Sequence, residues 1–313
     1  MTNDEVKALE PYDRLLWWIK LRHAVYRRKA AGRPKPWCEN ELMQQTYFTN
    51  VYRELDKTTV WFRENIREPL RNTSEVLFAT IAFRWFNWPL TGHLLKTRGG
   101  LMSGKDGPFG YFVGWKLDAV VDLLSRYRDE GNQVFTGAFN ISNSGSSKPK
   151  IDRVCDDYIQ PVWEQREKLV SFFDHGSLGK SHGPTLAAAH KMFMELPGLG
   201  GSGFMAGQVV ADLRHTYLLD KAPDLKYWAS IGPGSRRGMN YLHSRPPETP
   251  INSKQWQAEL TDLVARVNTD LSGGSYKWPY IHGQDMQNCL CETGKMNNIL
   301  FGNGRSKRRY LGV

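Results

Sequence analysis

Residues 195–240 read ELPGLGGSGFMAGQVVADLRHTYLLDKAPDLKYWASIGPGSRRGMN. The stretch begins with Leu196 and Pro197 and continues into the glycine-rich residues 198–203, where glycine permits the positive φ angles of tight turns. Apolar residues recur at helical spacing on both sides, which predicts helices at about 185–195 and 204–216. The sequence therefore predicts two helices joined by a glycine-rich hairpin.

The hairpin lies at the start of the second predicted helix. Free backbone N–H groups and the positive end of the helix dipole favour an anion there. We therefore expect a phosphate group to bind at the hairpin, through Gly198, Gly200, Gly201, Ser202 and Gly203.

Length and composition are those of an ordinary globular protein of 313 residues, with 40% hydrophobic and 24% charged residues. The chain has no run of 18 apolar residues that would span a membrane. Its N-terminus lacks the basic and apolar regions of a signal peptide, and four cysteines are too few and uneven for a disulfide framework. These features predict a cytoplasmic protein without a membrane partner.

The formal net charge of +10 favours a polyanionic partner. Charge alone does not separate nucleic acid from a merely basic surface. Basic clusters lie at 22–33, at 63–71 and in the tail at 305–309. If the partner is DNA, Arg214, Lys307 and Arg308 are expected to contact its phosphates together with the hairpin.

The rest of the chain is predicted to be mainly helical, with few short strands. Helices are expected at 11–31, 43–62, 74–87, 115–128, 154–174 and 253–271, an extended segment at 133–143 and a linker at 144–150. The predicted domains are 1–150 and 151–313, although one compact unit is an alternative. Arg53 and Asp56 would form a surface ion pair, and Arg84, inside an apolar helix, would either reach solvent or pair with a buried acid.

Three local patterns could hold a nucleotide or a metal. Residues 99–106 (GGLMSGKD) end in aspartate where a phosphate-binding loop needs serine or threonine, and residues 176–181 (GSLGKS) lack its spacing. Cys289 and Cys291, with His282 nearby, would make only half of a zinc site. We therefore expect neither an ATP site nor a bound metal here.

Several stretches together resemble one known family. They are FTNVYRELDKTT (48–59), FRWFN (83–87), the LPGLG hairpin, VVADLR (209–214), APDLKYWASIGPGSRRGMNYL (222–242), QDMQNCLCETGK (284–295) and GRSKRRY (304–310). In this order they resemble the phage α-glutamyl/putrescinyl thymine pyrophosphorylases, or amino acid:DNA transferases. The hairpin alone is similar to the helix-hairpin-helix of DNA glycosylases, and FTNVYRELDK resembles the helical domain of phage 5-hydroxymethyluracil DNA kinases.

The resemblance implies a glycosylase-like helical fold that acts on modified thymine in duplex DNA, in the host cytoplasm. An amine of an amino acid or polyamine would displace pyrophosphate from the exocyclic methylene group and form a C–N bond. No cofactor is implied with certainty, and a Mg²⁺ ion that accompanies the pyrophosphate is left open.

Roles follow for individual residues. Arg236 and Arg237, on a glycine-rich loop, would stabilise the pyrophosphate, and Asp224 would take a proton from the ammonium, with Asp212 and Asp220 in reserve. Asp224 could instead cap the helix that follows it. The residues expected to bind the substrates are Arg53, Asp56, Arg84, Asn87, Ser235, Glu292 and Lys295.

Two other functions remain open at this point. A monofunctional base-flipping DNA glycosylase would use an aspartate to stabilise the sugar cation, but it would leave GPGSRRG (232–238) unexplained. The catalytic lysine of bifunctional glycosylases is missing, because its position falls on Ser202 or Phe204. A non-catalytic protein would use the hairpin only to hold the DNA backbone.

Overall fold

The computed structural model describes residues 1–98, 109–137, 141, 146–175 and 183–304, and these are mainly helical. No β-strand occurs among them, so the few strands expected are not found, and residues 133–137 of the predicted extended segment are irregular. Within these ranges, no helix is long and apolar enough to cross a membrane.

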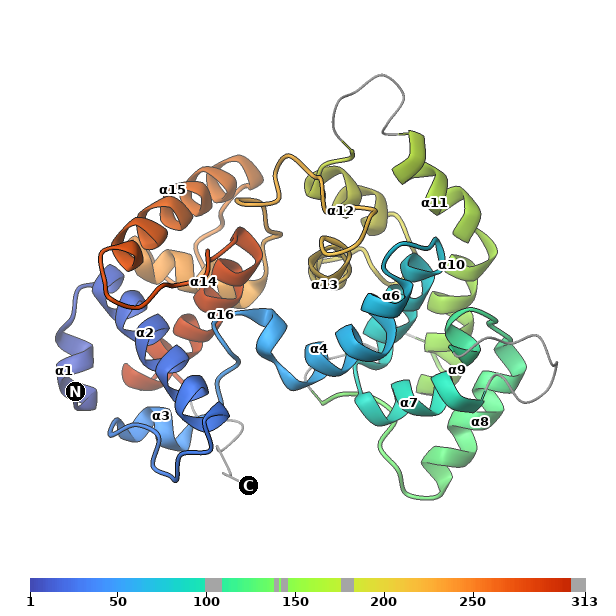
Figure 1. Ribbon diagram of the computed structural model, residues 1–313, viewed down its shortest axis with the longest axis horizontal. Coiled ribbons are helices and arrows are strands. Elements are labelled where there is room, and N and C mark those ends of the chain that lie inside the picture. Colours follow the sequence, from blue (N-terminus) through green and yellow to red (C-terminus); the bar gives the residue numbers. More distant parts are fainter. Residues whose placement is uncertain (99–108, 138–140, 142–145, 176–182, 305–313) are drawn as a thin grey trace. The chain divides into compact units, whose positions relative to one another are not determined.

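The chain divides into two compact units. Unit 1 comprises Met1–Asp56 and Lys226–Val313, and unit 2 comprises Lys57–Leu225, as the colours of Figure 1 make visible. The boundary suggested near residue 150 falls inside unit 2. Linker composition marks a loop, but it does not show that the N-terminal and C-terminal helices pack together.

Unit 1 contains α1 (Asn3–Ala8), α2 (Pro11–Ala30), α3 (Glu41–Gln45), the 3₁₀ turn η1 (Arg53–Leu55), α14 (Pro233–Leu242), α15 (Ser253–Ser272) and α16 (Gly283–Leu300). Unit 2 contains α4 (Lys57–Phe62), η2 (Arg63–Arg67), α5 (Glu68–Leu70), α6 (Glu75–Phe86), α7 (Pro89–Arg98), η4 (Gly110–Phe112), α8 (Leu117–Asp129), α9 (Lys150–Asp152), η5 (Arg153–Ile159), α10 (Gln160–Glu164), α11 (Arg166–His175), α12 (Leu186–Met194) and α13 (Phe204–Leu213).

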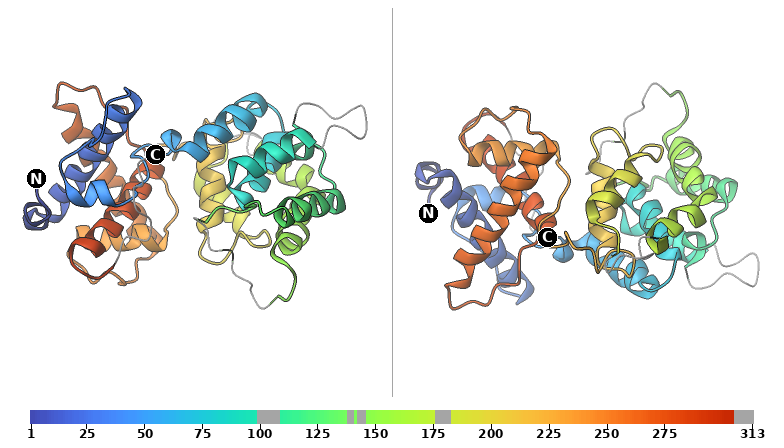
Figure 2. Two further views of the ribbon diagram at one scale, coloured as in Figure 1. Left: turned by 90° about the horizontal axis from the view of Figure 1, so that it is seen from below. Right: turned by 90° about the horizontal axis from the view of Figure 1, so that it is seen from above.

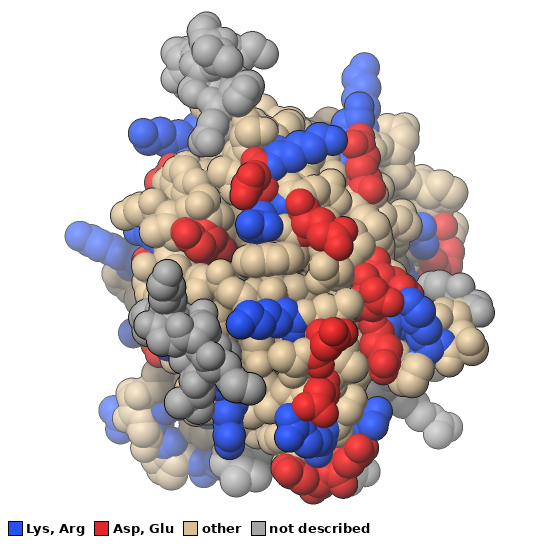
Figure 3. Space-filling view, turned by 90° about the vertical axis from the view of Figure 1, so that its right-hand side faces the viewer, with Lys and Arg blue, Asp and Glu red and all other residues tan. Residues whose placement is uncertain are grey.

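The positive charge is concentrated in unit 1. Lys and Arg outnumber Asp and Glu by 22 to 14 in unit 1 and only by 20 to 18 in unit 2. Figure 3 shows a face on which acidic and basic side chains alternate. Unit 2 also has exposed ion pairs, such as Lys148 with Asp156 and Asp157 at 2.6 Å each. Unit 1 therefore carries most of the excess positive charge that a polyanionic partner would meet.

Close contact between α14 and α16 builds the centre of unit 1. A Cβ atom on Gly238 would collide with the carbonyl oxygen of Leu290, and one on Gly234 would collide with the thiol of Cys291. Gly294 faces Gly234 and Gly238 in the same way, since a Cβ atom added to it would lie 3.0 Å from the Gly234 oxygen and 3.1 Å from the Gly238 nitrogen. Glycines on both helices therefore bring the N-terminal half of α14 directly onto the backbone of α16.

Gly238→Ala is expected to lower the free energy of unfolding by about 1–3 kcal/mol, because the added methyl group must displace helix backbone. Urea unfolding monitored by circular dichroism measures the loss. Gly273→Ala is the matched control, since nothing lies within 4 Å of its new Cβ atom. Equal midpoints for the two variants would contradict this packing.

Unit 2 is built around α6, where every residue from Val76 to Phe86 is buried. A helix that is apolar on all sides belongs in a core. Helix α13 packs on α6, and α12 packs on α13. Both views of Figure 2 show α12 and α13 side by side, joined by the short hairpin. The predicted helix–hairpin–helix segment thus forms two adjacent helices at the residues expected.

Candidate functional site

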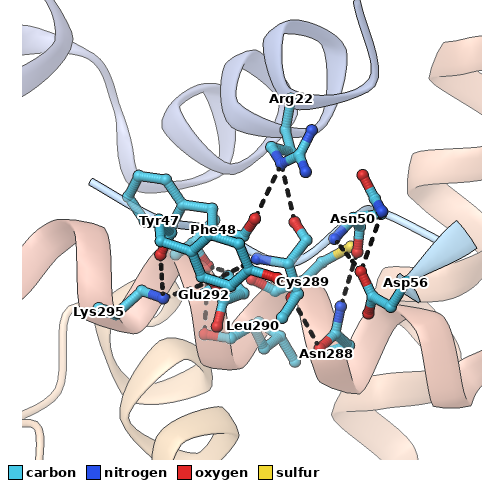
Figure 4. Close-up of polar contacts among 12 residues, drawn as sticks. Arg22, Tyr47, Phe48, Asn50, Asp56, Asn288, Cys289, Leu290, Glu292 and Lys295 are labelled. Atoms are coloured by element: carbon cyan, nitrogen blue, oxygen red, sulfur yellow. Dashed lines mark hydrogen bonds and ion pairs between the residues drawn. The ribbon is translucent and has the colours of Figure 1, made fainter. Parts of the chain in front are cut away.

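The segment 46–52 is extended, and side chains from α2 and α16 hold its backbone (Figure 4). Arg22 Nε donates to the carbonyl oxygens of Thr49 (2.9 Å) and Phe48 (3.2 Å). Glu292 accepts from the Thr49 N–H (3.0 Å), and Asn288 donates to the Asn50 carbonyl (2.8 Å). The helix predicted over 43–62 is therefore wrong between α3 and α4, because these partners replace the intrahelical hydrogen bonds.

Arg53 and Asp56 lie at the end of this segment. The Arg53 N–H donates to Asp285 Oδ1 at 3.0 Å. Asp56 Oδ1 accepts from the backbone N–H (2.9 Å) and the side-chain amide (3.0 Å) of Asn50. Asp56 is thus a half-buried group bonded to Asn50, and the expected surface ion pair with Arg53 is not what holds it.

The GPGSRRG segment is the first half of α14 and not a loop, which corrects the sequence interpretation. Gly232 is the N-cap residue and Pro233 occupies the first turn, where its missing N–H costs nothing. Ser235 is fully buried; it accepts from the Gly232 N–H (3.0 Å) and donates to the Gly232 carbonyl (3.1 Å). Ser235 therefore caps the helix with a buried hydroxyl, and its substrate-binding role stays a prediction.

Arg236 and Arg237 follow on the first turns of α14. Both contact the exposed carboxylate of Glu248, Arg236 at 2.7 Å and Arg237 at 2.5 Å. The hydrogen bond from Arg237 is the main cause that lowers the pKa of Glu248. The two guanidinium groups therefore share one surface anion, which an incoming phosphate could replace.

Charged groups from three segments lie close to the thiol of Cys291 on α16 and affect its pKa. Burial, and to a smaller extent the nearby Glu292, raise the pKa of Cys291 to about 11. Lys295, Arg237 and Arg53 lie close enough to act in the opposite direction. We call Arg53, Arg237, Glu292 and Lys295 around Cys291, together with Asp56, which lies close enough to Arg53 and Glu292 to interact with their charges, the α16 site. Five predicted site residues from three separate stretches are thus brought together in unit 1.

Glu292 and Lys295 form an internal pair in this site. Lys295 Nζ lies 2.6 Å from Glu292 Oε2, donates to the Tyr47 carbonyl (2.9 Å) and lies 4.8 Å from the centre of the Phe48 ring. Through these contacts, and through the hydrogen bond from Thr49 to Glu292, the pair holds residues 47–49 in place. Both side chains therefore make contacts within the protein, and their predicted role in substrate binding stays a prediction.

Other predicted residues lie in unit 2. Asp224 caps α12 through the N–H groups of Leu186 (2.7 Å) and Ala187 (3.1 Å), so it caps an earlier helix and not the one that follows it. Asp220 lies 3.9 Å from Arg71. Arg214 is buried and contacts His215 at 3.1 Å, which places most of its side chain away from solvent.

Arg84 and Asp212 form a buried ion pair between α6 and α13. Arg84 Nη2 lies 2.6 Å from Asp212 Oδ1, Arg84 Nε contacts Asp212 Oδ2, and Arg84 Nη1 donates to Asn87 Oδ1 at 2.8 Å. The expectation of a buried acid beside Arg84 is confirmed. Asp212, Arg84 and Asn87 are consequently placed in a core and bonded to one another.

The hairpin has the backbone conformation that its glycines suggested. Gly198, Gly201 and Gly203 have φ angles of 74°, 66° and 69°. Gly201 and Ser202 are exposed at the tip, whereas a Cβ atom on Gly200 would lie 2.7 Å from the Met194 carbonyl oxygen. Ser202 is thus accessible to a phosphate, and Gly200 is needed for the turn itself.

Some predicted features fall outside the described residues: Lys307, Arg308 and both phosphate-loop lookalikes at 99–106 and 176–181. The zinc half-site is not assembled, because Cys289 is buried against the Val51 carbonyl (3.7 Å) while Cys291 faces Gly234. Where side chains are described, no group of three His, Cys, Asp or Glu residues is arranged to hold a metal. A surface cavity of about 430 Å³ in unit 2, lined by residues such as Phe78 and Trp163, contains none of the predicted site residues.

Sequence reasoning missed the residues that hold the 46–56 segment, namely Arg22, Asn50, Asp285 and Asn288. The sequence of α16 contained a pattern that could have identified Asp285 and Asn288. Asp285, Asn288, Glu292 and Lys295 recur at spacings of three and four and form a polar stripe along one face. Because all four contact residues 47–53, this stripe marks the face that receives the segment.

Comparison with known proteins gives two matches. A family model described as "5-hmdU DNA kinase, helical domain" matches residues 10–303. The chain is also similar to the "5-hmdU DNA kinase" of Bacillus phage SP10, with 26% identity over 242 residues, which are 72% of this chain and 34% of that protein. The chain therefore spans about a third of the relative's length. No solved structure matches it.

Proposed function

We propose amine transfer onto DNA as the function of this chain, which belongs to the family of the helical domain of 5-hmdU DNA kinases. In this proposal it takes part in thymine hypermodification of phage DNA. The amine of an amino acid or polyamine displaces pyrophosphate from 5-(pyrophosphoryloxymethyl)uracil and forms a C–N bond. The relative is named as a kinase, and amine transfer is the step that would follow phosphorylation.

The observation that carries this proposal is the α16 site. A departing pyrophosphate needs fixed positive groups. Arg53, Arg237 and Lys295 supply cations within one small region, which also contains the carboxylates of Asp56 and Glu292. Unit 1 also has the excess of positive charge that attracts polyanions. A Mg²⁺ ion could accompany the pyrophosphate without a protein site of its own.

The direct test is incubation of the protein with duplex DNA that carries pyrophosphorylated 5-hydroxymethyluracil and a pool of amines. Nucleoside mass analysis is expected to show a heavier base and release of pyrophosphate. Abasic sites would instead identify a glycosylase. Unchanged DNA, in the presence of every amine supplied, would overturn the transferase assignment.

A second candidate is a helical module that holds DNA without chemistry. It is favoured by one specific observation, namely that the chain matches a helical domain and about a third of the kinase's length. Binding of DNA without turnover of the pyrophosphorylated base would identify it. Both candidates share the hairpin as a backbone-phosphate contact.

Ser202→Glu is expected to weaken DNA binding about tenfold at low salt, since a carboxylate at the exposed hairpin tip repels phosphate. Fluorescence anisotropy with labelled duplex measures the affinity. Gly200→Val is unsuitable for this test, because its side chain would strike the Met194 carbonyl. Asn132→Asp, an exposed change in the same unit, adds equal charge and is the control. Equal DNA affinities of the two variants would show that the hairpin does not contact the DNA.

A further inference from the structure

Asp56 differs from the other candidate acids in what its carboxylate contacts. Only Oδ1 accepts hydrogen bonds among the described residues, both of them from Asn50. Figure 4 shows the second oxygen pointing away from Asn50. Asp56 therefore has one oxygen fixed by the backbone turn and one oxygen available to accept a proton.

Two of the alternative acids, Asp224 and Asp212, have both carboxylate oxygens engaged. Asp224 uses both oxygens on the N–H groups at the start of α12. Asp212 uses both on Arg84. Glu292 Oε2 accepts from Thr49 and Lys295 together. Asp224 and Asp212 therefore cannot receive a proton without giving up a bond that holds the fold, whereas Glu292 is engaged with Thr49 and Lys295 through one oxygen.

Asp56 also lies in the same unit as the groups proposed to meet pyrophosphate. The charged groups that act on it are Arg53 on η1, Arg22 on α2 and Glu292 on α16. A base in this position stands next to cations that would hold the leaving group. The incoming amine and the departing oxygen must both lie near the same methylene carbon, so proximity of base and cations is required.

We propose that Asp56 is the general base of the amine transfer, an inference that rests on the proposed function. Asp56 Oδ2 takes a proton from the substrate ammonium, and the neutral nitrogen attacks the exocyclic methylene carbon. The C–N bond forms as the C–O bond breaks, and the electron pair of that bond leaves with the pyrophosphate oxygen. The new secondary ammonium then loses its extra proton to solvent.

The pKa of Asp56 supports this role. Burial raises the pKa of Asp56 to about 6, against the opposing effects of the Asn50 N–H, Arg53 and Arg22. A base whose pKa lies just below neutral is ionised at pH 7 and still holds a proton better than an ordinary aspartate. Activity should therefore fall as the pH drops through about 6, because the protonated acid no longer accepts a proton.

Asp56→Asn separates this role from a structural one. The amide oxygen can still accept from Asn50, so the turn keeps its hydrogen bonds. Because the pKa of Asp56 is raised in the folded protein, ionising this carboxyl above about pH 6 costs folding stability, so a neutral side chain is not expected to unfold the protein. Turnover of pyrophosphorylated DNA with a strongly basic amine such as putrescine should fall on the order of 10²-fold at pH 7.

The discriminating measurement uses methoxyamine, whose nitrogen is already unprotonated at neutral pH. Asp56→Asn should turn over with methoxyamine at nearly the parent's rate, and its inflection near pH 6 should disappear. Asn50→Ala is the structural control: it keeps the carboxylate and removes one of its donors, so any loss should be equal for both amines. Equal loss with putrescine and methoxyamine in Asp56→Asn would overturn the proposal, as would full activity with putrescine. A parent protein that turns over neither amine would instead overturn the proposed function.

Discussion

Arg84→Met is expected to lower the free energy of unfolding by about 3–5 kcal/mol, since it leaves Asp212 as an unpaired buried carboxylate. The side chains of Arg84 and Asp212 are only 3% and 2% exposed, so water cannot take the place of the lost partner. The same change removes the donor to Asn87 at the end of α6. Urea unfolding at pH 7 measures the loss.

Two controls define the cause. The double variant Arg84→Met with Asp212→Leu removes both charges and should recover most of the lost stability, because an apolar pair of similar volume avoids the desolvation cost. Arg126→Met breaks an exposed pair with Asp122 on α8 and should cost less than about 1 kcal/mol. A single Arg84 variant as stable as the parent would show that the guanidinium is free for substrate, as the sequence suggested.

Arg84 also illustrates what the sequence could supply. For a guanidinium inside an apolar helix the sequence left two alternatives, contact with solvent or a buried acid, and the structure shows the buried acid. Periodicity likewise predicted the helices found at α2, α6, α13 and α15, since each buries one apolar face or, for α6, its whole surface. Which acid pairs with Arg84 could not be predicted, because Asp212 lies 128 residues away.

The segment 43–62 shows why a helical pattern can mislead. Its spacing of apolar residues suits a helix, but Arg22, Asn288 and Glu292 satisfy its backbone groups from outside. Local propensity is a weak prior when distant side chains offer stronger partners. The same long-range contacts create the α16 site, which explains why its members could be proposed one by one but not as a group.

The interpretation of residues 232–238 (GPGSRRG) as a loop was wrong for a related reason. The glycines around Pro233 suggested a loop, yet Pro233 starts a helix, and the glycines allow that helix to lie directly on α16. The arginines are consequently fixed on the first turns of a packed helix. A rigid helix is a better support for fixed positive charge than a loop, because no reorganisation is needed when the leaving group becomes charged.

Arg237→Ala is expected to lower turnover of pyrophosphorylated DNA on the order of 10²-fold, while DNA affinity stays within about threefold of the parent. Arg237 lies near Cys291 together with Arg53, so its charge reaches the region where we place the pyrophosphate. Adjacent residues on a helix point about 100° apart. Arg236→Ala is therefore the matched control and should mainly weaken DNA binding, although both arginines contact Glu248 in the free protein.

Single-turnover kinetics and anisotropy, performed on the same variants, distinguish these effects. Arg237→Ala should also bind inorganic pyrophosphate more weakly, by about 10- to 150-fold, because a lost charge-assisted contact is worth roughly 1.5–3 kcal/mol. Arg53→Ala should resemble Arg237→Ala, since both cations act on the same region. If Arg237→Ala turns over at the parent's rate and binds pyrophosphate normally, then α14 does not meet the leaving group. In that case the arginines only attract the DNA backbone, and amine transfer at the α16 site loses the electrostatic stabilisation on which it depends.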